Sequence, residues 1–172
     1  MAGNWKGKKV LVTGITGFVG GAIARELVKQ GANVVGLTSS KKRIPDGDFL
    51  KKVNLYHGDI RDRDLLRNII SYNEIEYVYH LAAYAIVRNS ARDPATTYDV
   101  NFMGTLAVLE GVRQFGKCVK VITSSSDKAY GDHETLPYVE SHPLLAKNTY
   151  DASKACADIL SRAYRESYNL PV

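Results

Sequence analysis

A short apolar strand runs directly into a glycine-rich turn and a helix start in Lys9-Val10-Leu11-Val12-Thr13-Gly14-Ile15-Thr16-Gly17-Phe18-Val19-Gly20. Three glycines at such a junction permit, in order, a tight turn, a close approach of the backbone to a ligand, and close helix–strand packing; here they are Gly14, Gly17 and Gly20. The free N–H groups and the positive dipole end of the helix stabilise a diphosphate without a charged side chain. The segment therefore predicts a diphosphate-binding turn, and the alternative is the same turn without a ligand.

Short apolar runs alternate with longer helical patterns along the rest of the chain. The first helix spans Phe18–Lys29 and ends at Gly31, and further strands are expected at Asn33–Leu37, Val53–His57, Glu76–Ala82 and Cys118–Thr123. Helices are expected at about Asp62–Ser71, Pro94–Phe115 and Tyr150–Tyr168, with a long loop at Gly131–Asn148 and a sixth strand starting at Leu170. This alternation predicts an α/β fold, a Rossmann-type doubly wound parallel sheet, with residues 1–172 as one dinucleotide-binding domain.

The composition is that of an ordinary folded domain. The 172 residues are 45% hydrophobic and 24% charged, with a formal net charge of +5, so disorder is not indicated. Basic residues are spread along the chain, so no nucleic-acid partner is expected. The one cluster, Lys41-Lys42-Arg43, is either part of a solvated loop or a contact to a phosphate. The two cysteines and four histidines lack disulfide or ligand spacing, so no metal is expected. Without a membrane-length apolar run or a signal peptide, the sequence indicates a cytoplasmic protein without membrane association.

Two strand ends beside the glycine turn add to the predicted binding site. Asp59 follows the third strand, where its carboxylate can accept a hydrogen bond from an adenine amino group; the alternative is that it caps the next helix. The second strand ends in Thr38 and Ser39. At this position, dinucleotide-binding folds that prefer NAD have a carboxylate, which binds the ribose 2′-hydroxyl and repels a 2′-phosphate. The choice between NAD and NADP therefore stays open.

A candidate catalytic group follows in the last third of the chain. Tyr150 and Lys154 are four residues apart on one helical face, and an adjacent cation favours the phenolate form of a tyrosine that acts as an acid–base catalyst. Lys154 can also hold a nicotinamide ribose. The serine-rich segment Ser124–Gly131 follows the fifth strand, at the sheet edge where ligands bind, although a serine-rich turn without function is the alternative.

Together these residues resemble the extended short-chain dehydrogenase/reductase family, and within it the NAD-dependent nucleotide-sugar epimerases and dehydratases. The resemblance covers nearly the whole chain and is carried by Thr13–Gly20, Gly58-Asp59-Ile60, His80-Leu81-Ala82-Ala83, Asn101 with Gly104-Thr105, Ser124–Gly131 and Tyr150–Lys154. Ser126-Asp127-Lys128 and the stretch Val87–Pro94 are most similar to the pattern of CDP-glucose 4,6-dehydratases.

The resemblance implies roles for five catalytic residues, namely Ser126, Asp127, Lys128, Tyr150 and Lys154. Tyr150, assisted by Ser126, would take the proton of the sugar 4-hydroxyl while hydride passes from C4 to the nicotinamide. Asp127 would protonate the departing 6-hydroxyl. Lys128 stands where other sugar dehydratases place a glutamate base; it either serves as that base, which requires loss of its own proton, or is an exposed loop lysine.

The resemblance also implies the cofactor contacts and the partners. The cofactor is expected to be NAD, with NADP as the alternative, held by Gly14, Thr16, Gly17, Phe18, Val19, Gly20, Thr38, Ser39, Asp59, Ile60, Leu81, Ala82, Ala83, Asn101, Ser124, Tyr150 and Lys154. Members of the family continue into a domain that binds the nucleoside diphosphate sugar. We expect this chain to end before that domain, to have negligible activity alone, and to form a homodimer through the two long helices.

Two other functions remain open at this point. One is a nucleotide-sugar 4-epimerase or reductase that uses the same Tyr150 and Lys154. The other is a non-catalytic dinucleotide-binding protein, against which the joint presence of Ser126, Tyr150 and Lys154 argues, because simple binding needs none of them.

Overall fold

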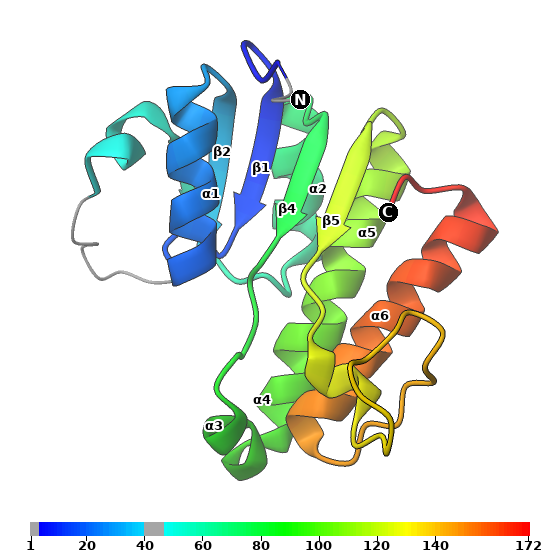
Figure 1. Cartoon of the computed structure of the whole chain (residues 1–172). Helices are drawn as coiled ribbons and strands as arrows, with labels where there is room; N and C mark the ends of the chain where they lie inside the picture. Colours follow the sequence, from blue (N-terminus) through cyan, green and yellow to red (C-terminus); the bar gives the residue numbers. More distant parts are fainter. Residues whose placement is uncertain (1–3, 40–46) are drawn as a thin grey trace.

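A parallel sheet forms the centre of the molecule. Within the residues that the computed structural model describes, 4–39 and 47–172, it has five strands: β1 (Lys9–Thr13), β2 (Asn33–Thr38), β3 (Asn54–His57), β4 (Tyr77–His80) and β5 (Lys120–Thr123). Their order is β3-β2-β1-β4-β5 (Figure 1). The chain thus builds outward from β1 in one direction and then, from β4, in the other. The carboxyl ends of β1 and β4 therefore flank the switch point at which open α/β sheets bind ligands.

Helices cover both faces of the sheet, as the predicted doubly wound fold requires (Figure 1). The helices are α1 (Phe18–Lys29), α2 (Arg63–Tyr72), α3 (Val87–Arg92), α4 (Pro94–Tyr98), α5 (Gly104–Phe115) and α6 (Thr149–Tyr168), with short turns η1 (Gly47–Lys52) and η3 (Asp127–Tyr130) and a π-helical turn η2 (Asp99–Met103). One core contains buried residues of α2, α5 and α6, and the other contains buried residues of α1 and η1. Adjacent residues of β1 serve both, since Leu11 packs in the first core and Val10 and Val12 in the second.

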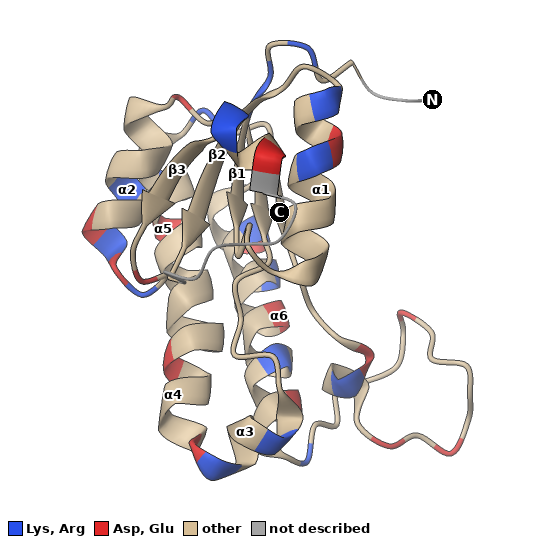
Figure 2. Ribbon diagram, turned by 90° about the vertical axis from the view of Figure 1, so that its left-hand side faces the viewer, with Lys and Arg blue, Asp and Glu red and all other residues tan. Residues whose placement is uncertain are grey.

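The strands and helices predicted between residues 9 and 168 are all present, some with different bounds, whereas the described residues contain no sixth strand at Leu170. The strand expected at Glu76–Ala82 is Tyr77–His80, and the one expected at Cys118–Thr123 is Lys120–Thr123. The loop Gly131–Asn148 has no helix or strand of its own beyond an isolated bridge between Gly131 and Leu145. It projects from the body of the molecule (Figure 2).

The helix expected from Pro94 to Phe115 is interrupted, which the apolar pattern did not predict. It consists of α4, the π-helical turn η2 and α5, and it ends at Gly116, which adopts a left-handed conformation (φ 69°) as expected. A π turn adds one residue to a single helical turn, a local change that the spacing of apolar residues over the whole segment did not resolve. The short helix α3 was not predicted either.

The last residues lie beside the outer strand of the sheet. The Val121 N–H donates to the Pro171 carbonyl at 2.8 Å, which places residues 170–172 along β5 where a sixth strand was expected to start. Lys and Arg, like Asp and Glu, are scattered over several elements along the ribbon (Figure 2). No helix in the described ranges is long and apolar enough to cross a membrane.

Candidate functional site

The glycine turn between β1 and α1 has the geometry that its sequence predicted. Gly14 has φ +68°, and a Cβ atom there would lie 2.8 Å from the Ala82 N atom. Both the backbone conformation and the lack of space for a side chain therefore require glycine at this position. A Cβ atom on Gly20 would clash with the Gly14 carbonyl oxygen, which shows how closely α1 approaches the turn. Gly17 is the N-cap of α1, has no side-chain cap, and no acidic residue follows in the first turn. The helix start is therefore free to receive an anion.

A cleft of about 460 Å³ opens at this turn, along the carboxyl ends of β1, β2, β3 and β4. It is lined by most of the predicted cofactor contacts, namely Gly14, Thr16, Gly17, Phe18, Val19, Gly20, Thr38, Ser39, Asp59, Ile60, Leu81, Ala82 and Ala83. Sequence reasoning missed four further lining residues, Leu37, Gly58, Ala85 and Val100. Gly58 belongs to the Gly58-Asp59-Ile60 motif but was not predicted as a contact, and the other three are small or apolar and carry no signal that separates them from core residues.

The remaining predicted cofactor contacts lie outside this cleft. Asn101 is in η2, Ser124 follows β5, and Tyr150 and Lys154 are on the first turns of α6. Lys154 is nearly buried, and its Nζ donates to the Ser124 carbonyl at 2.7 Å, which joins α6 to the end of β5. Burial lowers the pKa of Lys154 because it disfavours the charged form. The Tyr150 hydroxyl has no hydrogen-bond partner among the described residues.

The predicted catalytic residues after β5 form a small, open group. Ser126 caps η3: its hydroxyl donates to Asp127 Oδ1 and accepts from the Lys128 N–H, each at 3.2 Å. Asp127 and Lys128 are both exposed. The exposure of Lys128 agrees with the second of the two interpretations that the sequence left open, an exposed loop lysine.

A buried chain of hydrogen bonds connects the glycine turn to α6. The Thr13 hydroxyl accepts from the N–H groups of Leu81 and Ala82, both at 3.2 Å, so its own proton points to His80 Nδ1 at 2.8 Å. His80 therefore carries its proton on Nε2, which lies 3.1 Å from the Thr105 hydroxyl. Burial, and secondarily the charge of Lys154, lowers the pKa of His80 to about 3.

The same chain continues through η2. The Thr105 hydroxyl donates to the Asn101 carbonyl at 2.6 Å, Asn101 Nδ2 donates to the Ser153 hydroxyl at 2.8 Å, and that hydroxyl donates to the Tyr150 carbonyl at 2.7 Å. Asn101, predicted as a cofactor contact, is thus also a buried link between helices. Thr105 and Ser153 were not predicted as site residues. The signal available in the sequence was a hydroxyl side chain at a helix position that the apolar pattern marks as buried.

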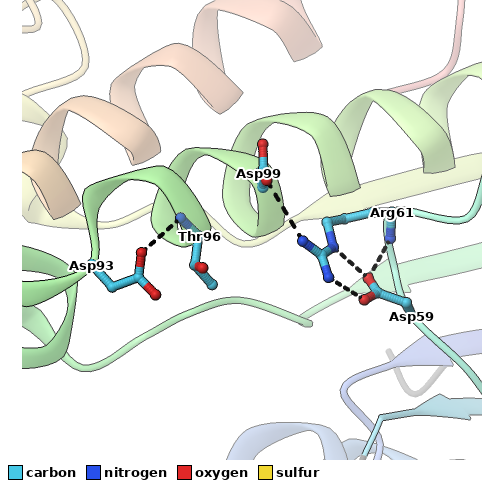
Figure 3. Close-up of polar contacts among 5 residues, drawn as sticks. All are labelled: Asp59, Arg61, Asp93, Thr96 and Asp99. Atoms are coloured by element: carbon cyan, nitrogen blue, oxygen red, sulfur yellow. Dashed lines mark hydrogen bonds and ion pairs between the residues drawn. The ribbon is translucent and has the colours of Figure 1, made fainter.

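The corner after β3 holds Asp59 in a network of charged contacts (Figure 3). Asp59 Oδ1 accepts from both the N–H and Nε of Arg61 at 2.9 Å, and Oδ2 accepts from Arg61 Nη2 at 2.6 Å. These hydrogen bonds lower the pKa of the Asp59 carboxyl. Asp59 does not cap α2, which was the alternative interpretation, because Asp62 does so through the Leu65 N–H.

The end of β2 forms the next part of the cleft. The hydroxyls of Thr16 and Thr38 lie 2.8 Å apart, so the glycine turn and β2 are joined directly. Lys41-Lys42-Arg43, the basic group expected near a 2′-phosphate, lies outside the described residues. In the described part of the chain no group of three or more His, Cys, Asp or Glu side chains is arranged to hold a metal.

Comparison with known proteins places this geometry in a family. The family model described as GDP-mannose 4,6 dehydratase matches residues 11–172. A CDP-glucose 4,6-dehydratase of Salmonella typhimurium is 38% identical over 172 residues, which cover 97% of this chain and 48% of that protein.

Solved structures agree with this result. The dTDP-glucose 4,6-dehydratase of Streptomyces venezuelae with NAD and TYD has a TM-score of 0.85 at 29% identity, over 94% of this chain and 53% of that one. The UDP-glucose 4-epimerase of Thermotoga maritima with UDP-glucose has a TM-score of 0.86 at 30% identity, over 94% of this chain and 52% of that one. This chain thus spans about half the length of these relatives. It belongs to the GDP-mannose 4,6 dehydratase family.

Proposed function

We propose that this chain binds NAD in the cleft and serves a nucleotide-sugar 4,6-dehydratase of the CDP-glucose type. One observation carries the proposal: a single cleft at the sheet's switch point gathers the glycine turn and the ends of β2, β3 and β4. The similar dTDP-glucose 4,6-dehydratase of Streptomyces venezuelae holds NAD, which supports the choice of ligand.

The cleft offers each part of the dinucleotide a suitable partner. The diphosphate fits the free N–H groups at the start of α1, beside Gly17. The adenosine ribose fits Thr38 and the adenine fits Asp59, because these follow β2 and β3 in order along the sheet. The nicotinamide end then extends past Ala82 toward Lys154. Neither Thr38 nor Ser39 carries a charge that repels a 2′-phosphate, so we propose NAD with NADP tolerated at less than a tenfold disadvantage, about 1.4 kcal/mol.

The residues beyond the cleft would handle the protons of the reaction. Held by the cleft residues, NAD would supply an acceptor for hydride from sugar C4 and a hydride donor for C6. Tyr150 would take the proton of the 4-hydroxyl with help from Ser126, and Lys154 would hold the nicotinamide ribose. Asp127 would protonate the departing 6-hydroxyl so that it leaves as water. Lys128, which is exposed, would remove the C5 proton only in its uncharged form.

A 4-epimerase is the second candidate, favoured by the similar Thermotoga maritima enzyme. It would use the same cleft, Tyr150 and Lys154, but would need no acid for a departing hydroxyl. Asp127 beside Ser126 favours the dehydratase, since its carboxyl group, in the protonated form, would offer that acid next to the serine.

The reaction is tested with the natural gene product in full, incubated with NAD and, separately, CDP-glucose, dTDP-glucose and UDP-glucose. Release of a 4-keto-6-deoxy sugar from one of them, abolished by Tyr150→Phe, is the expected result. A 4-epimer as the only product would instead establish the alternative. No product from any sugar nucleotide would contradict both.

We further propose a homodimer formed through the α4–α5 segment and α6, in a reducing, cytoplasmic setting. Exposed apolar side chains on these helices, Tyr98 and Ile159, support the first proposal, and the two free cysteines, Cys118 and Cys156, suit the second. Sedimentation at high micromolar concentration should show a dimer that Ile159→Glu weakens. A parent protein that sediments only as a monomer would rule this contact out.

A further inference from the structure

Arg61 joins two segments that belong to different parts of the fold. It lies between β3 and α2 and makes three hydrogen bonds to the Asp59 carboxylate, from its N–H, Nε and Nη2. Its Nη1 also lies 3.6 Å from Asp99 Oδ2, at the start of η2. Figure 3 shows the guanidinium held between these two carboxylates.

Arg61 supports one end of the cleft without lining it. Asp59, Ile60 and Val100 all line the cleft, whereas Arg61 does not, so its guanidinium acts on a ligand there only through its neighbours. A second contact joins the loop after β3 to the segment that contains η2 and α5. A Cβ atom on Gly104 would lie 2.9 Å from Ile60 Cγ2, so this loop packs closely on the start of α5. The base-binding end of the cleft is therefore fixed by Arg61 and by the Ile60–Gly104 contact together.

The hydrogen bonds of Arg61 limit what Asp59 can still bind. An ionised carboxylate accepts about four hydrogen bonds, two on each oxygen, and donates none. Arg61 occupies both sites on Oδ1 and one on Oδ2, which leaves one acceptor site on Oδ2. These bonds also favour the ionised form, since they lower the pKa of the Asp59 carboxyl. Such a carboxylate takes one N–H donor and repels a carbonyl oxygen.

We propose that Arg61 is a positioning residue that makes the cleft select a purine with a 6-amino group over one with a 6-oxo group. It does so by fixing Asp59 in place as an acceptor with a single free site, braced against Asp99. The inference rests on the proposed dinucleotide function and deepens it, since it assigns base selection to a residue outside the cleft.

The test compares binding of NAD with binding of nicotinamide hypoxanthine dinucleotide, which differs by having a 6-oxo in place of the 6-amino group. Calorimetry on the parent should show at least a tenfold preference for NAD, about 1.4 kcal/mol. Arg61→Gln should reduce that preference to less than about threefold, mainly by weakening NAD binding. Arg61→Lys should behave similarly, because an ammonium keeps the charge but lacks the planar fork.

Two further variants make the result specific. Asp99→Asn removes the outer brace and should lower the preference less than Arg61→Gln, because the Asp59–Arg61 pair stays. Arg67→Gln is the matched control: it breaks an Arg–Asp pair of 2.9 Å with Asp64 on α2, and neither residue lines the cleft, so the preference should stay at the parent value. Arg61 is 43% exposed in its side chain, so its loss should leave the fold intact, which a melting curve of each variant checks.

The outcomes separate this inference from the proposed function. If Arg61→Gln weakens both dinucleotides equally, Arg61 only stabilises the loop and the inference is wrong. A parent that binds NAD without preferring it over the hypoxanthine analogue also refutes the inference, while the proposed function stands. A parent that binds neither dinucleotide refutes the proposed function and this inference with it.

Discussion

At the scale of single residues, hydrogen-bond direction determines the state of the buried His80. The Thr13 hydroxyl already accepts two backbone N–H groups, so it must donate to His80 Nδ1, and the imidazole is held neutral with its proton on Nε2. A second proton would have to enter at Nδ1 and would break that bond. The pKa of His80, lowered to about 3 by burial, agrees with this assignment.

His80 should make the stability of the protein depend on pH. Its folded pKa of about 3 lies below its ordinary 6.5, so the unfolded chain takes up the proton first as the pH falls. The contribution of His80 is therefore complete above about pH 6.5 and is lost as the pH falls toward 3, by at most about 1.4 kcal/mol per pH unit. Urea unfolding from pH 7 to pH 4 should show a steeper loss for the parent than for His80→Gln. Equal slopes would mean that His80 is not held neutral.

At the scale of elements, the sequence predicted the strands and helices whose bounds depend on the local pattern of apolar residues. The bounds of β1 and α1 are those read from the apolar runs, because a buried strand and an amphipathic helix each impose their own period on the chain. The π-helical turn η2 was not predictable in this way. Its extra residue changes the helical spacing for one turn only, and the Asn101 side chain within it bonds to Ser153 of α6.

The sequence likewise predicted only those residues of the candidate cofactor site that follow from local pattern and strand order. The glycine turn and Asp59 were recognisable because each follows a strand, and the order of parallel strands brings their carboxyl ends to one edge. Arg61 and Thr105 were not, because their importance lies in partners from other elements, Asp99 and His80. Contacts of that kind appear only once the sheet and helices are packed.

Neighbouring glycines in α1 should differ in their tolerance of alanine. A Cβ atom on Gly20 would clash with the Gly14 carbonyl oxygen, whereas on Gly21 its nearest contact is the Ile15 carbonyl oxygen at 3.4 Å. Gly20→Ala should therefore lower the free energy of unfolding by about 1–3 kcal/mol. Gly21→Ala should be neutral or raise that energy by up to about 1 kcal/mol, because alanine favours the helix. Equal effects in urea unfolding would show that α1 does not approach the turn so closely.

At the scale of the whole molecule, the proposed cofactor cleft and the residues proposed to transfer protons lie in different surroundings. The cleft is built from the ends of four strands, whereas Asp127 and Lys128 lie exposed on η3. A dinucleotide therefore finds a formed site in this chain, while a sugar beside η3 would remain in contact with water. Catalysis depends on holding reactants in attack geometry with water excluded.

The 172-residue chain should accordingly bind the cofactor yet turn over slowly. Loss of positioning alone can raise a barrier by roughly 7–11 kcal/mol. With saturating NAD and CDP-glucose, we expect no 4-keto product above the rate of a Tyr150→Phe control. Product formation at a rate typical of enzymes, about 1 per second or faster, would show that the exposed site suffices.

The central claim is that the cleft at the glycine turn binds a dinucleotide, and calorimetric titration of the chain with NAD tests it most directly. Gly17 is the N-cap of α1 with an extended backbone (φ −79°, ψ 171°) that valine can adopt, and a Cβ atom there would lie 3.2 Å from the Gly14 carbonyl oxygen, a close but small contact. The branched side chain of valine would occupy the space where the diphosphate would lie. The parent and the control Gly21→Ala should bind NAD alike, and Gly17→Val should bind at least tenfold more weakly, about 1.4 kcal/mol, at a temperature where its melting curve shows it folded. Binding of NAD by Gly17→Val as tightly as by the parent, or no binding by the parent, would contradict the account.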